Sequence, residues 1–216
     1  MKRLLPVRQR GQSLTEFVVA MVGFGVLLLA LLQAILLYRA KTTVDYAALE
    51  AARAGALHGA DKGQMQKGLA RGLTPLYATA TASPSAVGTA EAYAQAYPAV
   101  LAFSTITVLS PNTGSFDDFK ESQYDGRMAI PNDTLNFRSG SVGARGGLSV
   151  QDANILKIQV SYTYPLIVPI IDRILGTLDV KRTALEGHTV YSIPLVASAM
   201  ARMQSPIIDR GNLPAP

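Results

Sequence analysis

The sequence RGQSLTEF at residues 10–17, followed by the apolar run FVVAMVGFGVLLLALLQAILL at residues 17–37, decides the fold of this chain. The run contains no charged residue, and Gln33 is its one strongly polar side chain. A helix of this length would be roughly 32 Å long at about 1.5 Å per residue, against a hydrocarbon core of about 30 Å. Residues 17–38 are therefore predicted to span a membrane, with Tyr38 at its surface.

The charge of the chain is concentrated before Gly11. Four of the 20 basic residues precede it, which leaves 16 basic against 15 acidic residues in the remainder. These four residues are Lys2, Arg3, Arg8 and Arg10. Basic residues on that side of the span predict a cytoplasmic N-terminus and a body on the outside. The remainder is nearly neutral, so we expect no nucleic-acid partner.

The helical pattern continues beyond the apolar run. Strong helix formers without a proline extend it to about Gly59, which predicts one helix over residues 12–59. Its second half is rich in alanine, and small side chains there would pack closely against the body or against a neighbouring subunit.

Residues 60–216 are predicted to form a small globular domain. Helices are expected at residues 64–76 and 89–99, with a linker at 79–88 between them. The second helix is expected to end at Pro98 and to carry Tyr93 and Tyr97 on one face. Residues 111–150 are rich in Gly, Asn, Asp and Ser and predict a long surface loop. The apolar residues 166–175 are too few to span a membrane and are expected to form a short helix.

Alternating patterns predict the strands. Residues 154–164 give the strongest one, because Leu156, Ile158, Val160, Tyr162 and Tyr164 alternate with polar residues, as in a sheet with one buried face. Further strands are expected at residues 104–109, 178–185 and 190–203, with Pro194 breaking or bending the last. The predicted class is α+β: a long N-terminal transmembrane helix carrying a small domain with a mostly antiparallel sheet.

Four stretches carry a family resemblance: Arg10-Gly11 followed by Glu16-Phe17, AALEAARAG at residues 47–55, YTYPLIVP at 162–169, and LVASAMARMQSP at 195–206. They resemble the TadE-like minor pilins, or pseudopilins, of Tad (Flp) type IV pilus systems. The resemblance covers residues 8–55 and 154–206.

The resemblance implies a prepilin whose leader, residues 1–11, is removed by a prepilin peptidase between Gly11 and Gln12. Arg10, Glu16 and Phe17 would serve peptidase recognition and assembly. The implied setting is the bacterial inner membrane, with a periplasmic body, and the implied partners are the peptidase, other pilins or pseudopilins and the Tad platform proteins. Many type IV pilins begin with a methylated phenylalanine, whereas this chain would begin with Gln12, which puts methylation in doubt.

The position of Glu16 supports that resemblance on physical grounds. A carboxylate within a membrane helix is costly unless it has a partner or lies near the surface. Cleavage after Gly11 would free an amine at Gln12, one helical turn away, on the same subunit or on a neighbour. The alternative is an acid that reaches the interface and binds water.

No catalytic or metal-binding constellation is evident in the sequence, and no cofactor is expected. Cysteine is absent and only His58 and His188 are present, too few for the usual zinc site. The acids at 117, 118, 121 and 125 lack the pattern of a calcium loop and predict a solvated acidic loop. The alternative functions are an anchored binding domain or enzyme unrelated to pili, and a pseudopilin of a secretion or DNA-uptake machine.

Overall fold

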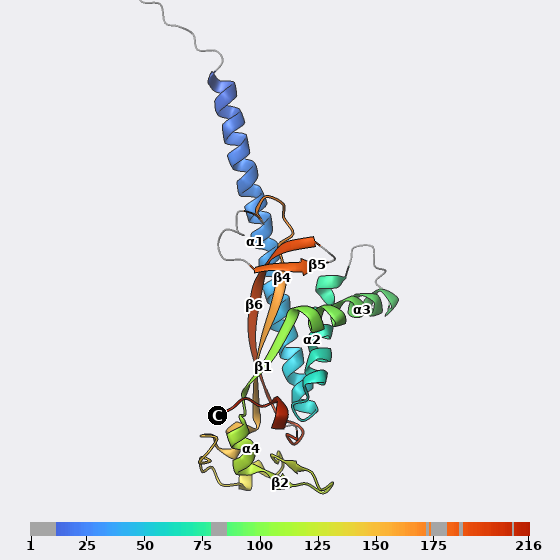
Figure 1. Ribbon diagram of the computed structural model, residues 1–216, viewed down its shortest axis with the longest axis vertical. Coiled ribbons are helices and arrows are strands. Elements are labelled where there is room, and N and C mark those ends of the chain that lie inside the picture. The colour runs from blue at the N-terminus through green and yellow to red at the C-terminus, as the bar shows by residue number, and fades with distance from the viewer. Residues whose placement is uncertain (1–11, 79–85, 172, 174–180, 186–187, 209) are drawn as a thin grey trace, which may run out of the picture. The chain divides into compact units, whose positions relative to one another are not determined.

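The computed structural model describes residues 12–78, 86–171, 173, 181–185, 188–208 and 210–216 (Figure 1). These residues fall into two compact units. The first combines the N-terminal residues up to 38 with residues 165–193, and the second combines residues 39–164 with 194–216. Helix α1 contributes residues to both. The fold is α+β, as predicted: a long N-terminal helix followed by a small domain with an antiparallel sheet.

Helix α1 spans Gln12–Leu57 without interruption and confirms the predicted long helix. Its end is set by two residues in the left-handed region, Gly59 at φ 64° and Ala60 at φ 65°. The N–H of Ala60 donates to the carbonyl of Gly55 at 2.9 Å and closes the last turn. The predicted leader, residues 1–11, lies outside the described residues.

Helix α2 (Lys62–Tyr77) confirms the helix predicted at residues 64–76. The carboxylate of Asp61 caps its start by accepting a hydrogen bond from the N–H of Gln64 at 2.7 Å. Gly68 and Gly72 of α2 face the alanine-rich half of α1, and neither position has room for a side chain. The small residues of α1 therefore pack against the body, one of the two contacts that the sequence left open.

Helix α3 (Ala86–Phe103) is longer than predicted, because Pro98 lies inside it rather than at its end. Proline removes the hydrogen bond to the carbonyl four residues earlier, here that of Ala94. Ala94 and Pro98 are both exposed, so water can replace that bond. Tyr93 and Tyr97 share one face, as predicted, and their rings stack with centroids 6.2 Å apart. Residues 79–85 of the predicted linker lie outside the described residues, and residues 86–88 belong to α3.

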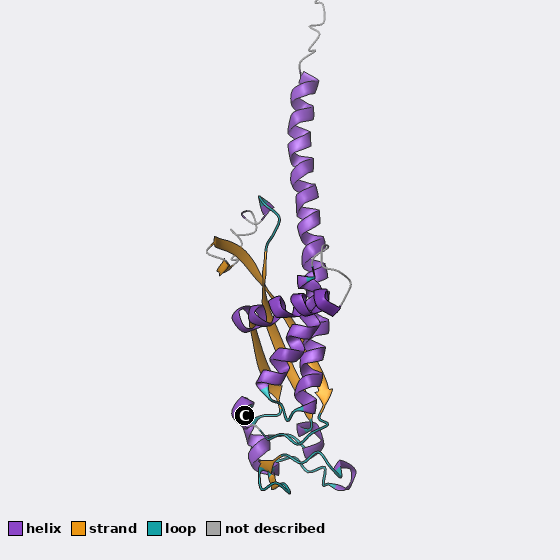
Figure 2. Ribbon diagram, turned by 90° about the vertical axis from the view of Figure 1, so that its right-hand side faces the viewer, coloured by secondary structure: helices purple, strands orange, loops and turns teal. Residues whose placement is uncertain are grey.

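The sheet has the strand order β1-β4-β6-β5 and confirms the four predicted strands. Figure 2 shows the strands in orange. Its strands are β1 (Ser104–Ser110), β4 (Ile155–Pro165), β5 (Lys181–Leu185) and β6 (His188–Arg202). β1 runs antiparallel to β4, with Ile106 opposite Val160 and Val108 opposite Ile158. The alternating apolar residues of β4 are all buried, and the intervening residues are exposed or half-buried.

Pro194 was expected to break or bend the last strand, and β6 continues through it without a break. Within the described residues, Lys181 of β5 faces Ser192 of β6, two residues before Pro194.

The predicted loop at residues 111–150 contains more regular structure than its composition indicated. It holds α4 (Thr113–Phe119), the paired short strands β2 (Glu121–Ser122) and β3 (Met128–Ala129), and η1 (Leu135–Phe137); α5 (Val150–Ala153) follows. One carboxylate oxygen of Asp118 accepts hydrogen bonds from the N–H groups of Arg145 and Gly146, both at 2.8 Å. Distant parts of the segment are thus joined by side-chain contacts, which composition does not indicate.

The helix predicted over residues 166–175 was wrong for its first half. Residues 166–170 form extended chain and a turn after Pro165, and residues 172, 174 and 175 lie outside the described residues. Pro165 and Pro169 both disfavour a helix at the residue that precedes them.

The C-terminal segment is bound to the end of α1 within the second unit. The N–H groups of Gln204 and Ser205 both donate to the carbonyl of Ala56, at 3.0 and 3.2 Å. The hydroxyl of Ser205 accepts a hydrogen bond from the N–H of Gly59 at 2.7 Å. Ile207 forms a bridge with Ile130. The tail after β6 therefore closes the lower end of the domain rather than hanging free.

Candidate assembly segment of the N-terminal helix

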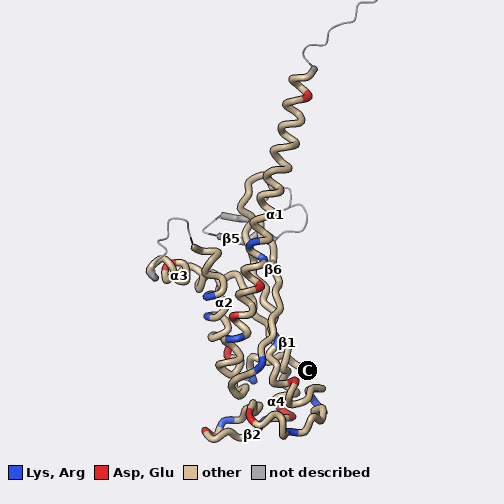
Figure 3. The backbone as a smooth tube through the Cα atoms, turned by 180° about the vertical axis from the view of Figure 1, so that it is seen from behind, with Lys and Arg blue, Asp and Glu red and all other residues tan. Residues whose placement is uncertain are grey.

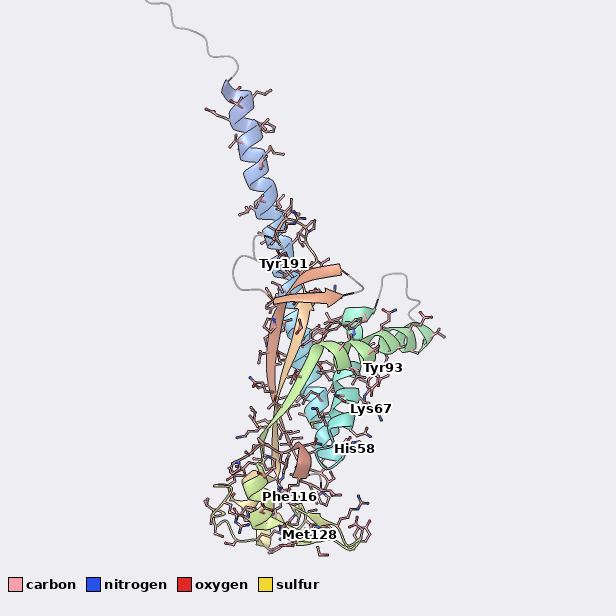
Figure 4. All side chains as sticks on the ribbon, in the orientation of Figure 1. His58, Lys67, Tyr93, Phe116, Met128 and Tyr191 are labelled. Atoms are coloured by element: carbon pink, nitrogen blue, oxygen red, sulfur yellow. The ribbon has the colours of Figure 1, made fainter. Side chains whose placement is uncertain are left out.

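The N-terminal half of α1 exposes nearly all of its apolar side chains (Figure 4). The exposed large residues are Leu14, Phe17, Val18, Val19, Met21, Val22, Phe24, Leu27, Leu28, Leu31, Leu32, Ile35 and Tyr38. An apolar surface of this extent is rare on a soluble protein and marks contact with lipid or protein. Within the described residues, one helix is long and apolar enough to cross a membrane, judged by length and composition, and it is this one.

Glu16 is the one charged residue of residues 12–38 (Figure 3). It is exposed and lies one helical turn from Gln12, with Phe17, 63% exposed, beside it. The structure thus places Glu16 and Phe17 together on the apolar helix. Arg10 and Gly11 lie outside the described residues, so the predicted cleavage site remains a prediction.

Gln33 is the exception to the exposure of this half. Its side chain is 1% exposed, and its Oε1 accepts a hydrogen bond from the N–H of Val168 at 3.0 Å. Its Nε2 is buried without a hydrogen-bond partner. Sequence reasoning noted Gln33 as the lone polar residue of the run but did not identify its partner. The sequence did offer one indication of this contact: residues 165–171 form a second apolar stretch, and such a stretch has to pack against another part of the protein.

The second half of α1 has the opposite character, because its alanines are buried against the body. Ala47, Ala48, Ala51 and Ala52 are all fully buried. On its outer side, charged residues pair at helical spacing: Lys41 with Asp45, and Glu50 with Arg53 at 3.0 Å. The helix is thus divided into an exposed apolar half and a half integrated into the domain.

Residues 11–53 match the family model of the TadE-like proteins. Over this segment the chain is similar to the TadE-like proteins. TadE-like proteins belong to the pilins associated with Tad pili, a family that is structural rather than catalytic. The searches of curated proteins and of solved structures returned no match. The family assignment agrees with the resemblance drawn from the sequence.

The TadE-like segment covers parts of both halves of α1. It includes the exposed apolar half with Glu16 and extends to the alanines that pack on α2. The match to the TadE-like model and a helix of this length fit a single-pass membrane anchor.

The acidic residues at 117, 118, 121 and 125 each have a protein partner. Asp117 accepts hydrogen bonds from Arg210 at 2.8 Å and from Lys120 at 3.2 Å, and these bonds hold the pKa of its carboxyl below the usual value. Glu121 pairs with Arg138 at 2.5 Å, and Asp125 with Arg127 at 3.0 Å. The acids thus contribute to the internal contacts of this region. In the described part of the chain, no group of three or more His, Cys, Asp or Glu is placed to hold a metal ion.

A cavity of about 420 Å³ lies between α1 and the sheet within the second unit. Its lining is mostly apolar and includes Leu49, Leu109, Ile158 and Met200, with Asp45 and Lys157 as the charged groups. An anchored enzyme or binding domain would need several converging polar groups in such a pocket. This cavity is lined by three polar side chains, Asp45, Lys157 and Ser198, within a mostly apolar wall, so it gives that alternative little support.

Proposed function

We propose that this chain is a minor pilin, or pseudopilin, of a Tad (Flp) type IV pilus assembly system. The observation that carries the proposal is the TadE-like match over residues 11–53, on a helix whose N-terminal half exposes its apolar side chains. The chain inserts in the bacterial inner membrane as a single-pass protein, with a cytoplasmic N-terminus and a periplasmic body. Prepilin peptidase removes residues 1–11 by cleavage between Gly11 and Gln12.

Glu16 acts in assembly in this account. The new amine of Gln12 on one subunit pairs with the carboxylate of Glu16 on a neighbour, which sets the axial position of the incoming subunit. The exposed apolar side chains supply the adhesion between helices, since they lose contact with lipid only by gaining contact with protein. The position of Glu16 on an otherwise uncharged helix surface supports this assignment.

The chain performs no chemistry of its own in this role and needs no cofactor. It acts in pilus biogenesis, and through the pilus in adhesion or secretion. Its partners are the peptidase, other pilins or pseudopilins, and the Tad platform proteins. Its length favours a minor role, because the major pilins of Flp systems are typically much shorter chains.

The proposal is tested by locating the protein in cells. Pili sheared from the surface, inner membranes and periplasm are separated and probed with an antibody to the body of the chain. We expect the protein in the inner membrane and in the sheared pili, and the pilus signal should disappear in cells without the Tad assembly ATPase. Unchanged piliation in cells that lack this chain would contradict the proposal and favour an anchored domain unrelated to pili.

A further inference from the structure

The segment PLIVPII at residues 165–171 follows β4 and contains no polar side chain. It belongs to the same compact unit as residues 12–38 of α1. Figure 1 shows this segment, in orange, beside α1. Its length and composition do not suit a membrane span, so its apolar character requires another explanation.

One hydrogen bond determines the level at which this segment meets α1. Val168 donates its N–H to Oε1 of Gln33 at 3.0 Å, inside the apolar run. Gln33 precedes Tyr38, the interfacial end of the expected span, by just over one helical turn, or roughly 7–8 Å along the helix axis. When the run occupies a bilayer, the backbone of Val168 therefore lies below the headgroups.

Non-helical backbone is tolerated at that depth only if its polar groups are satisfied or absent. Pro165 and Pro169 have no N–H group. Leu166 donates its N–H to the carbonyl of Tyr191 at 2.8 Å, and Val168 donates to Gln33. The donors of these four residues are thus satisfied or absent.

The side chains of the segment divide into an inner and an outer set. Leu166, Val168 and Ile171 are buried, whereas Ile167 is 62% exposed and Ile170 is 53% exposed. Ile170 adopts a φ of 75°, a region that is unfavourable for a β-branched residue. An isoleucine held at such a φ is strained, and strained residues of this kind are concentrated at functional contacts.

We propose that residues 165–171 enter the membrane leaflet that α1 leaves at Tyr38, and that Ile167 and Ile170 contact its acyl chains. The inference rests on the membrane anchor of the proposed function but not on pilus assembly. Lipid is the occupant because Leu32 and Ile35 of α1 are exposed at the same level of the helix as Gln33. The segment thereby fixes the depth and tilt of the helix in the membrane.

The natural chain contains no cysteine, so single-cysteine variants can be labelled at one site. Ile167→Cys and Ile170→Cys carry an environment-sensitive fluorophore in the full, unprocessed chain. The protein is inserted in vesicles of equal amounts of phosphatidylethanolamine and phosphatidylglycerol. Val22→Cys, 65% exposed within the expected span, serves as the lipid reference. Met200→Cys, 64% exposed on β6, is the matched control for an exposed apolar side chain of the body.

Brominated acyl chains should quench the labels at residues 167 and 170 several-fold more than the label at residue 200, while aqueous iodide quenches residue 200 more. A different result would overturn this inference but leave the membrane anchor intact: iodide quenches the labels at residues 167 and 170 as strongly as the label at residue 200, while the label at residue 22 is in lipid. If iodide also quenches the label at residue 22, that residue lies in water, and both this inference and the proposed membrane anchor would be overturned. The protein is also diluted with empty lipid. If the labels at 167 and 170 then become accessible to iodide, a second copy of the chain covered this surface instead of lipid, and the inference would be overturned.

Discussion

Gly72 of α2 lies so close to Ala47 of α1 that a Cβ atom built on Gly72 would be 2.4 Å from the Cα of Ala47. One turn earlier in α2, a Cβ on Gly68 would be 2.8 Å from the carbonyl oxygen of Glu50. The two helices therefore approach at backbone contact distance. This relationship explains the alanines of α1, because larger side chains on either helix would separate the pair.

Substitution of Gly72 by Ala should destabilise the chain by about 1–3 kcal/mol, since the added methyl group must displace the backbone of α1. The matched control is Gly63→Ala in the same helix, where a Cβ meets only the carboxylate of Asp61 at 3.3 Å. The free energy of unfolding is measured by circular dichroism during denaturation of the full chain in detergent. Equal stability of the two variants would contradict the close packing of α1 and α2.

The contact between Tyr77 and Tyr162 predicts a loss of stability at alkaline pH. Their hydroxyl oxygens are 2.6 Å apart, and burial raises the pKa of both hydroxyl groups. In the unfolded chain tyrosines ionise near pH 10, before the folded ones do, so the unfolded state releases more protons there. The stabilisation is complete below about pH 10 and is lost as the pH rises further.

Unfolding free energies measured on both sides of that pH should therefore fall with increasing pH in the natural chain, and less steeply in Tyr162→Phe. Tyr124→Phe is the control, because this side chain is fully exposed and its removal should leave the slope unchanged. An identical slope in Tyr162→Phe and Tyr124→Phe would refute the role of the buried pair.

Asn154 joins β4 to the long segment before it. Its side chain is fully buried, and its Nδ2 donates to the carbonyls of Pro131 and Val150, both at 2.9 Å. Asn154→Ala leaves these carbonyls without a donor and should cost about 2–3 kcal/mol. Asn132→Ala, at a half-buried position, should cost much less. Thermal unfolding in detergent compares the two, and a smaller loss for Asn154→Ala than for Asn132→Ala would count against this account.

Glu16→Val should leave membrane insertion intact and reduce incorporation into pili several-fold, because the carboxylate that receives the neighbour's amine is lost. Glu16→Gln tests charge with little change of shape and should behave in the same way. Met21→Leu replaces one exposed apolar side chain of the same helix by another and is the control. The measurement is the amount of protein in sheared pili relative to that in the inner membrane. Normal incorporation of both Glu16 variants would remove the pairing argument.

Sequence patterns predicted what depends on neighbours along the chain. The uninterrupted apolar and alanine-rich run predicted α1, and strict alternation predicted the buried face of β4. Sequence patterns failed where the three-dimensional surroundings of a residue decide the local structure. Pro98 stays within α3 because the carbonyl it leaves free is exposed, and exposure is not encoded in the local pattern.

The candidate assembly segment shows the same limit. The apolar run was identified from composition, and Glu16 from its spacing together with the family resemblance. The role of Gln33 was not, because its partner, Val168, is distant in the sequence and donates a backbone N–H, which every residue but proline carries. The apolar segment that follows β4 was predicted to be a helix, whereas residues 166–170, with Pro169 and the contact of Val168 with Gln33, form extended chain and a turn.

The most direct test of the central claim is N-terminal sequencing of the membrane-bound protein from cells with and without the prepilin peptidase. Our account predicts a chain that begins at Gln12 when the peptidase is present and an intact leader when it is absent. An intact leader in both cases would contradict it, because Gly11 would then be no cleavage site and Glu16 would have no new amine to bind.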